Sequence, residues 1–142
     1  MKNTFKKHLS PHFILYEFVR SGTADDNDID NTPTARHIDN LTSLCANILE
    51  PLRRRFGPIV ISSGYRCQRL NKLVGGVSTS QHCLGQAADI VVGDKERAQR
   101  LAAFIKANLD FDQLILEPIG APAPRWLHVS YRRKEKNRHQ VL

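Results

Sequence analysis

Two histidines and one aspartate in the second half of the chain have the residue types and spacing of a metal site. His82 and Asp89 lie seven residues apart, and His128 lies in a later run whose alternation is typical of a strand. A single histidine near a strand is more often structural. Two neutral imidazoles and one carboxylate, however, are the three ligands that a catalytic zinc ion requires, with a fourth position left for water. Zinc held in this way acidifies the water and polarises a carbonyl group.

The elements that must position these residues can be predicted from hydrophobic periodicity. Apolar residues between Ile38 and Leu52 recur every three or four positions, which indicates a helix that Thr32 caps and that ends at Gly57. Further on we expect strands at 58–62, 87–92, 111–117 and 125–131, a short helix near Leu70 and a helix from Lys95 to about Asn108 capped by Asp94. Helices followed by mostly neighbouring strands predict an α+β fold in which an antiparallel sheet is backed by helices.

The length and composition are those of one globular domain. The chain has 142 residues, of which 41% are hydrophobic and 25% are charged, so we expect a single core. Within it we expect an irregular N-terminal segment (1–30), the catalytic domain (31–131) and a basic C-terminal tail (132–142). No apolar run approaches the ~20 residues of a membrane span. The N-terminus lacks a small-residue cleavage site, so we expect no signal peptide and synthesis in the cytoplasm.

The net charge of +7 is concentrated in the tail, because residues 132–138 carry five of the basic residues and one glutamate. A basic tail can contact nucleic acid or an anionic polymer such as a cell wall, and it can equally be a solvated, frayed terminus. No aromatic residues are interleaved with these charges, and no helix-turn-helix or zinc-finger pattern is present. We therefore do not expect a nucleic acid partner.

Two other groups of residues are interpreted as structural. Cys45, Cys67 and Cys83 form no C-x-x-C pair and are odd in number, so we expect free thiols, with Cys45 in the core. A nucleophilic role for Cys67 or Cys83 is a minor alternative. The acidic run 25–30 lacks the glycine and the final glutamate of a calcium loop, so we interpret it as a polar surface loop.

Three motifs together resemble one known family. Residues 80–89 read S-x-H-x-x-G-x-A-x-D, residues 63–66 read SGYR, and residues 126–128 read W-x-H. In this order they resemble the zinc D-alanyl-D-alanine carboxypeptidases and their relatives, the D-Ala-D-Ala dipeptidases, the phage L-alanyl-D-glutamate endolysins and the hedgehog signalling domain. The resemblance covers about 31–131 and is strongest to the short phage and bacterial members.

The resemblance implies a role for each motif. It implies that Arg66 grips a substrate carboxylate, which suits the two parallel hydrogen bonds that a guanidinium can donate. Ser80 would orient the ligand loop or bind the substrate backbone, Gln113 would orient the substrate, and the small residues Gly85 and Ala87 would allow close packing beside the metal. The Zn²⁺ ligands that it implies are His82, Asp89 and His128.

One position departs from the family pattern. Many members carry a catalytic glutamate three residues before the last histidine, but here this position is Arg125, which cannot accept a proton from water. Either catalysis is lost, or another carboxylate serves as the base, and the candidate is Glu117. If the last two strands pair so that Glu117 is opposite Trp126, then Ile115 is opposite His128, and Glu117 shares a face with His128. The alternative is a surface glutamate closing a hairpin.

These observations predict a zinc metallopeptidase that hydrolyses peptidoglycan stem peptides, with a zinc-activated water and a carboxylate base. The alternatives are a non-catalytic zinc-binding module of the same fold and a nucleic-acid-binding accessory protein. Carboxypeptidase and endopeptidase action both stay open, because the choice depends on a cleft built by loops 68–80 and 118–125. A phage-derived chain would act on the cell wall. The sequence leaves the oligomeric state open.

Overall fold

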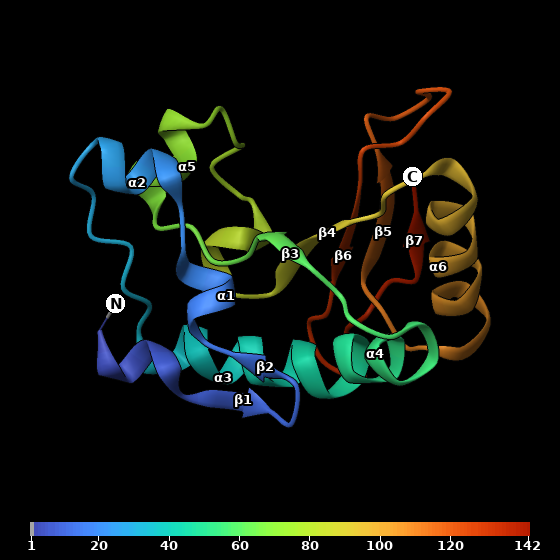
Figure 1. The fold of residues 1–142 in the computed structure, drawn as a ribbon, viewed down its shortest axis with the longest axis horizontal. Coiled ribbons are helices and arrows are strands. Elements are labelled where there is room, and N and C mark those ends of the chain that lie inside the picture. The colour runs from blue at the N-terminus through green and yellow to red at the C-terminus, as the bar shows by residue number, and fades with distance from the viewer. Residues whose placement is uncertain (1) are drawn as a thin grey trace.

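The computed structural model describes residues 2–142, and its central feature is a five-stranded sheet in the order β3-β4-β6-β5-β7 (Figure 1). Neighbouring strands are antiparallel except β5 and β7, which are parallel. The strands are β3 (Ile61–Ser63), β4 (Ala87–Val91), β5 (Gln113–Glu117), β6 (Trp126–Ser130) and β7 (Gln140–Val141). The expected antiparallel sheet is confirmed, with one parallel strand added at its edge.

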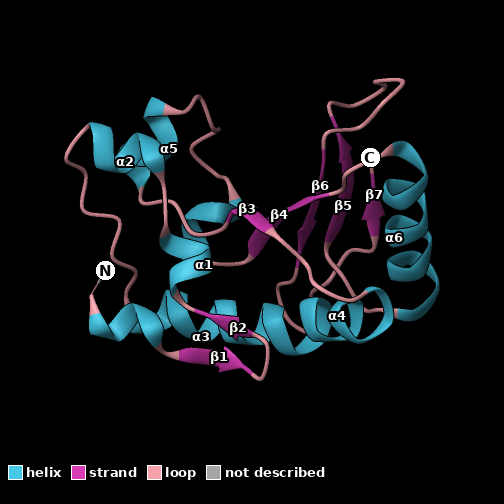
Figure 2. Ribbon diagram, in the orientation of Figure 1, coloured by secondary structure: helices cyan, strands magenta, loops and turns pink. Residues whose placement is uncertain are grey.

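Helices surround this sheet, which confirms the α+β class (Figure 2). The helix α6 contacts β5 and β6, and α4 contacts α6. The helices that follow the N-terminal segment are α3 (Ala35–Leu44), the π-helical turn η2 (Cys45–Leu49), α4 (Glu50–Phe56), α5 (Gln68–Leu73), the 3₁₀ turn η3 (Gln81–Leu84) and α6 (Lys95–Asn108). Within residues 2–142, no helix combines the length and apolar character that crossing a membrane needs.

The long helical segment that starts the catalytic domain begins two residues later than predicted. Thr34, rather than Thr32, is the N-cap, because its side chain accepts a hydrogen bond from the backbone N–H of His37, whose ring accepts one from the N–H of Thr34. The segment passes through a π-helical turn just before Pro51, which has no N–H for a regular helical bond. It ends at Gly57, as predicted, with a φ of 81° that favours glycine.

The core lies on one face of the sheet, and strand alternation leaves the other face for the functional residues. Ala88 and Ile90 of β4 and Leu127 and Val129 of β6 are buried in the main apolar cluster together with residues of α3, η2, α4 and α6. Residues at the intervening positions, including Asp89 and His128, therefore point to the opposite face.

The N-terminal segment contains short helices and strands, where we expected an irregular segment over 1–30. Phe13, Leu15 and Phe18 are buried in the main core. The buried carboxylate of Glu50 accepts two hydrogen bonds from this segment, one of 2.8 Å from the N–H of His12 and one of 2.5 Å from the hydroxyl of Ser10. Its elements are η1 (Asn3–Lys6), β1 (His8–Ser10), β2 (Phe13–Ile14), α1 (Tyr16–Val19) and α2 (Gly22–Asp26).

The C-terminal tail also folds back onto the domain instead of fraying. Its last residues form β7 along the edge of β5. Arg138 donates from Nε and Nη2 to the fully buried carboxylate of Asp112, at 3.0 and 2.7 Å. The side chain of Gln81, next to His82, donates to the same carboxylate at 3.0 Å. The tail is thus connected by one buried acid to the turn that carries His82.

Candidate metal centre

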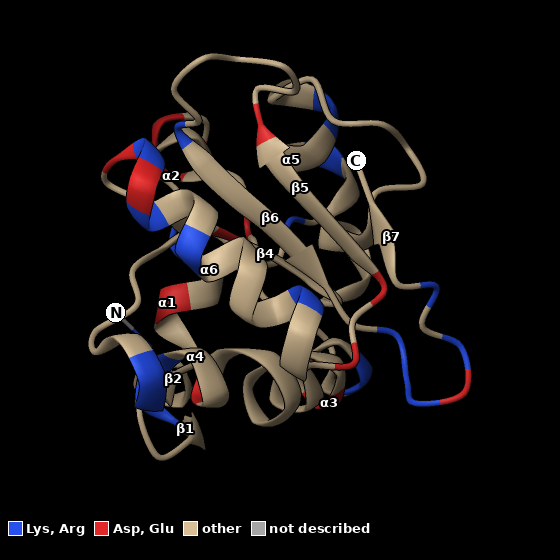
Figure 3. Ribbon diagram, turned by 90° about the vertical axis from the view of Figure 1, so that its right-hand side faces the viewer, with Lys and Arg blue, Asp and Glu red and all other residues tan. Residues whose placement is uncertain are grey.

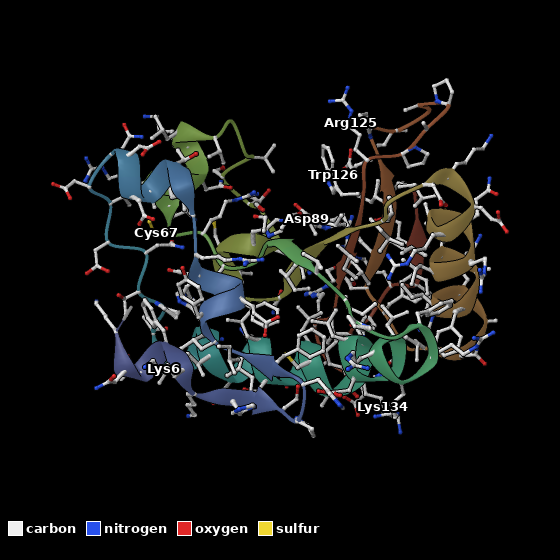
Figure 4. All side chains as sticks on the ribbon, in the orientation of Figure 1. Lys6, Cys67, Asp89, Arg125, Trp126 and Lys134 are labelled. Carbon is white, nitrogen blue, oxygen red and sulfur yellow. The ribbon has the colours of Figure 1, made fainter. Side chains whose placement is uncertain are left out.

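The register of β4 and β6 brings two of the predicted ligands together. Asp89 is paired directly with His128, and both point away from the core. Ser63 of β3 is paired with Asp89 on the other side, so the SGYR segment begins beside the same position. Figure 4 shows Asp89 near the centre of the molecule, toward the β3–β4 end of the sheet, with Trp126 and Arg125 near the β5–β6 loop.

His82 reaches this position from the η3 turn. The hydroxyl of Ser80 caps the turn by accepting a hydrogen bond from the N–H of His82 at 3.2 Å. Gly85 ends it with a φ of 72°, and a Cβ atom there would lie 2.5 Å from the carbonyl oxygen of His37. Only glycine fits both the left-handed conformation and this close approach. The turn is therefore held tightly against the start of α3.

The side chains of His82, Asp89 and His128 converge on one point. Nε2 of His82 lies 3.3 Å, and Nδ1 of His128 lies 2.9 Å, from Oδ1 of Asp89. One ligand atom from each residue lies within 4.8 Å of the other two, and residues 2–142 contain no other such group of His, Cys, Asp or Glu. Burial would raise the pKa of Asp89, but hydrogen bonds and charge from the two histidines outweigh it and lower that pKa. The carboxylate is therefore ionised, as a metal ligand must be.

The orientation of His82 is determined by a backbone carbonyl. Its Nδ1 atom donates a hydrogen bond of 2.6 Å to the carbonyl oxygen of Gly64, and this leaves Nε2 as the ring nitrogen directed to the shared point. In histidines that bind a metal, the ring nitrogen that does not face the metal usually donates a hydrogen bond of this kind. Two imidazoles and a carboxylate, each partly or fully buried, make a donor set that suits zinc with an open position.

Comparison with known proteins agrees with this geometry. The sequence over residues 11–130 matches the family model described as Peptidase M15. The chain belongs to the peptidase M15 family. No curated protein sequence matches it significantly. M15 peptidases depend on zinc, and the group of His82, Asp89 and His128 can bind such an ion.

Arg66 lies beside the metal ligands of this M15 peptidase. Its backbone N–H donates to the carbonyl oxygen of His82 at 3.2 Å, and its guanidinium is half-buried. Burial lowers the pKa of Arg66, whereas the nearby Asp89 carboxylate acts in the opposite direction. The guanidinium remains charged because its pKa starts so far above neutrality. It is therefore a cation next to the point where the ligand atoms meet.

Two residues that our sequence analysis missed hold this guanidinium in place. Asn71, which is almost fully buried, accepts from Nε of Arg66 at 3.1 Å, and Ser63 accepts from Nη1 at 3.3 Å. Asn71 also donates to the carbonyl oxygen of Val77 and so links Arg66 to the loop that follows α5. Ser63 lies in the SGYR motif, whereas no sequence signal pointed to Asn71, because its burial is visible only in the structure. Nη2 of Arg66 has no hydrogen-bond partner within the described chain and is available to a ligand.

Ser80 and Gln113 have partners that bear on their predicted roles. The Ser80 hydroxyl caps the His82 turn, a geometry that agrees with the loop-orienting alternative. Gln113 lies on the same sheet face as His128, but its side-chain amide donates to Gln140 of β7 at 2.7 Å. Contact of either side chain with a substrate remains a prediction.

Glu117 and His128 share a sheet face. Ile115 is paired with His128 and Glu117 with Trp126, which is the register that we predicted conditionally. Glu117 is therefore the diagonal neighbour of His128, and such neighbours typically lie about 7–8 Å apart, with their Cβ atoms somewhat closer. Its side chain is half-buried, whereas Arg125, at the usual position of the family glutamate, is exposed. Glu117 is thus a carboxylate near the ligand group.

The remaining histidines and the cysteines have other surroundings. His37 packs on Tyr65 with ring centroids 4.7 Å apart, and His139 pairs with Asp110 at 2.6 Å. Cys45 is fully buried in the core, as predicted, and all three thiols are free. Burial raises the pKa of the Cys83 thiol, which disfavours the nucleophilic thiolate.

Proposed function

We propose that this M15 zinc peptidase hydrolyses peptide bonds in peptidoglycan stem peptides, as a D-Ala-D-Ala carboxypeptidase or as an endopeptidase of the endolysin type. The observation that carries the proposal is the position of Arg66, a half-buried guanidinium beside the converging ligand atoms of His82 and Asp89. Stem peptides carry carboxylates close to their scissile bonds, and a planar guanidinium binds carboxylates with two parallel hydrogen bonds.

In this proposal each residue has one task. His82, Asp89 and His128 hold the zinc ion, which supplies an acidified water and polarisation of the scissile carbonyl. Arg66 binds the substrate carboxylate through the donors that Asn71 and Ser63 leave available. Ser80 orients the His82 turn or binds the substrate backbone, and Gln113 orients the substrate. The segment 68–80, which begins with α5, and the loop 118–125 would form the walls of the cleft.

Glu117 is the proposed general base of the reaction. Its carboxylate takes a proton from the attacking water and returns it to the leaving amine, as general acid–base catalysis requires. The proposal is supported by the place of Glu117 diagonal to His128, on the face of the sheet opposite the core. Arg125 cannot perform this task, since a guanidinium has no acceptor atom.

The test is to incubate the zinc-loaded chain with purified muropeptides and to identify the products by mass spectrometry. Loss of a terminal D-alanine would identify a carboxypeptidase, and cleavage between L-alanine and D-glutamate an endopeptidase. The His82→Ala variant serves as the control for contaminating hydrolases. If no stem-peptide bond is cut by the zinc-loaded parent, the proposed function is wrong.

One observation favours a second candidate, a zinc-binding module without catalysis. Arg125 replaces the glutamate that many family members carry three residues before the last histidine. A protein of this kind would bind muropeptides with its zinc centre intact and release no product. Binding of a muropeptide to the zinc-loaded chain, followed by full recovery of the uncut peptide, would distinguish it from the peptidase.

The place of action follows from the proposed substrate. Stem peptides belong to the cell wall, so we propose synthesis in the cytoplasm followed by action on the wall, as in phage-type enzymes.

A further inference from the structure

A basic hollow is lined by residues of α3, of the segment after the His82 turn and of the C-terminal tail. It has a volume of about 390 Å³, and four of its side chains are cationic. It is lined by Arg36, Asn40, Gln86, Arg132, Arg133 and Lys136. No carboxylate lines it, and none of its four cations has an ion-pair partner among residues 2–142. Four like charges held together without a counter-charge favour the binding of an anion.

Residues 132–138 form a turn that supplies three of these four cations and is held in place at both ends. At one end it follows directly from β6, and at the other Arg138 is bound to the buried Asp112 and leads into β7. Within the turn, the backbone N–H of Lys136 donates to the carbonyl oxygen of Arg133, and the N–H of Arg132 donates to the side chain of Asn137. Figure 3 shows this Lys- and Arg-rich turn projecting near α3. Its charges are therefore partly pre-organised, which lowers the entropy cost of binding.

The opposite wall is formed by α3 and the segment after η3. Arg36 and Asn40 lie one helical turn apart, and the Asn40 side chain donates to the carbonyl oxygen of Leu84 at 2.8 Å. Gln86 lines the hollow four residues after His82, and its side chain accepts a hydrogen bond from Gln81. The hollow is thus connected to the metal centre through a single turn of chain.

From this arrangement we propose that the hollow binds phosphate groups of an anionic phosphodiester polymer of the cell wall and so holds the peptidase against its substrate. The proposal rests on the proposed function for the choice of the wall as the source of the polymer. Guanidinium groups bind phosphate oxygens in pairs, and amide side chains add neutral donors. The hollow has no aromatic side chain on which a nucleic acid base could stack, which favours a polymer without bases.

The test measures binding of poly(glycerol phosphate) to the zinc-loaded full chain by fluorescence anisotropy at several salt concentrations. The double variant R36Q/R133Q removes one cation from each wall of the hollow. Its dissociation constant should rise at least about 10-fold at 0.1 M salt, and the slope of log K against log salt should fall by about 1.5, since each lost phosphate contact contributes about 0.7–0.9. The matched control is R54Q/R55Q, which removes two exposed arginines of α4 outside the hollow and should change the constant less than about 2-fold.

Two results would overturn the proposal. Equal weakening in both double variants would mean that only the net charge matters. Tighter binding of a single-stranded oligonucleotide with the same number of phosphates would assign the hollow to nucleic acid. Cleavage of a short soluble stem peptide by R36Q/R133Q should equal that of the parent, because neither arginine touches the metal centre. Polymer binding by a chain that cuts no peptide would refute the proposed function and leave the phosphate site standing.

Discussion

The Nδ1 atom of His82 lies 2.6 Å from the carbonyl oxygen of Gly64, and this hydrogen bond joins the SGYR segment to the metal centre. Gly64 itself is pressed against α1, where a Cβ atom would lie 2.7 Å from the Cα and carbonyl oxygen of Phe18. The N–H of Tyr65 donates to the same carbonyl of Phe18 at 2.7 Å. The N-terminal segment therefore determines where the Gly64 carbonyl stands, and through it the direction of the His82 ring.

Substitution of Gly64 should thus weaken zinc binding without touching a ligand. In Gly64→Ala the new methyl group meets backbone atoms, which cannot move away cheaply, so the Gly64 carbonyl must shift. Loss of such support commonly costs 10- to 100-fold in metal affinity, and we expect a loss on the order of 10-fold in a competition assay with a chelator. Gly22→Ala is the matched control, because open space surrounds a Cβ atom there. Unchanged affinity in Gly64→Ala would contradict the role of this carbonyl.

The ligand assignment predicts zinc content directly. The parent should hold about one zinc ion per chain, and His82→Ala, Asp89→Ala and His128→Ala should each lose it, because two protein ligands bind zinc poorly. The measurement is elemental analysis after dialysis against a weak chelator. His37→Ala and His139→Ala should keep their zinc, since both side chains have other partners. Full zinc content in the His82 or His128 variant would rule out the site.

The carboxylate-binding role of Arg66 predicts a loss of cleavage with zinc retained. Arg66→Lys keeps the positive charge but loses the two-pronged geometry and the hydrogen bond to Asn71. We expect kcat/KM on a stem peptide to fall by an amount equivalent to about 1–3 kcal/mol of transition-state stabilisation. Arg69→Lys, on the exposed surface of α5, should behave like the parent. If Arg66→Ala cleaves as fast as the parent, the carboxylate is bound elsewhere.

The role of Glu117 predicts a loss of turnover without loss of zinc or fold. Glu117→Gln preserves the shape of the side chain but removes the group that accepts a proton, so kcat should fall at least ~100-fold. Zinc content and the circular dichroism spectrum should equal those of the parent. The exposed Glu135 provides the control variant Glu135→Gln. Parent-like turnover in Glu117→Gln would end its candidacy as the base.

The buried carboxyl group of Glu50 should make the stability of the fold depend on pH. Burial would raise the pKa of its carboxyl group, but hydrogen bonds from Ser10 and His12 outweigh burial and hold the pKa below its usual value. A lowered folded-state pKa means that this stabilisation is complete above the unfolded pKa of about 4.3 and is lost as the pH falls through the folded value. Glu50→Gln should lower the free energy of unfolding at pH 7 by about 2 kcal/mol. The free energy of unfolding of Glu50→Gln should also decrease less than that of the parent when the pH is lowered below about 4.3.

Chemical denaturation at a series of pH values measures this difference. Glu96→Gln, an exposed position on α6, is the control and should follow the parent curve. Parallel curves for Glu50→Gln and the parent would show that Glu50 makes no pH-dependent contribution.

Local patterns in the sequence determine much of this protein by themselves. The alternation in 126–130, with Leu127 and Val129 apolar, is enough to place His128 on the face opposite the core, since side chains in a strand alternate strictly. The same rule leads from one pair of residues, Glu117 and Trp126, to the whole register of β5 and β6. Helix ends at Gly57 and Asp94 also follow from short-range preferences.

The tertiary structure decides everything that depends on contacts between distant segments. The strands and helices of the N-terminal segment are too short to produce a periodic pattern, and they are ordered because Phe13 and Phe18 pack into the core and Glu50 binds the β1–β2 turn. The support of His82 by a backbone carbonyl leaves no trace in residue type, since every residue has a carbonyl group. Asn71 accepts a hydrogen bond from Arg66, and Asp112 binds Arg138 of the C-terminal tail. Both contacts depend on side-chain directions that sequence spacing does not specify.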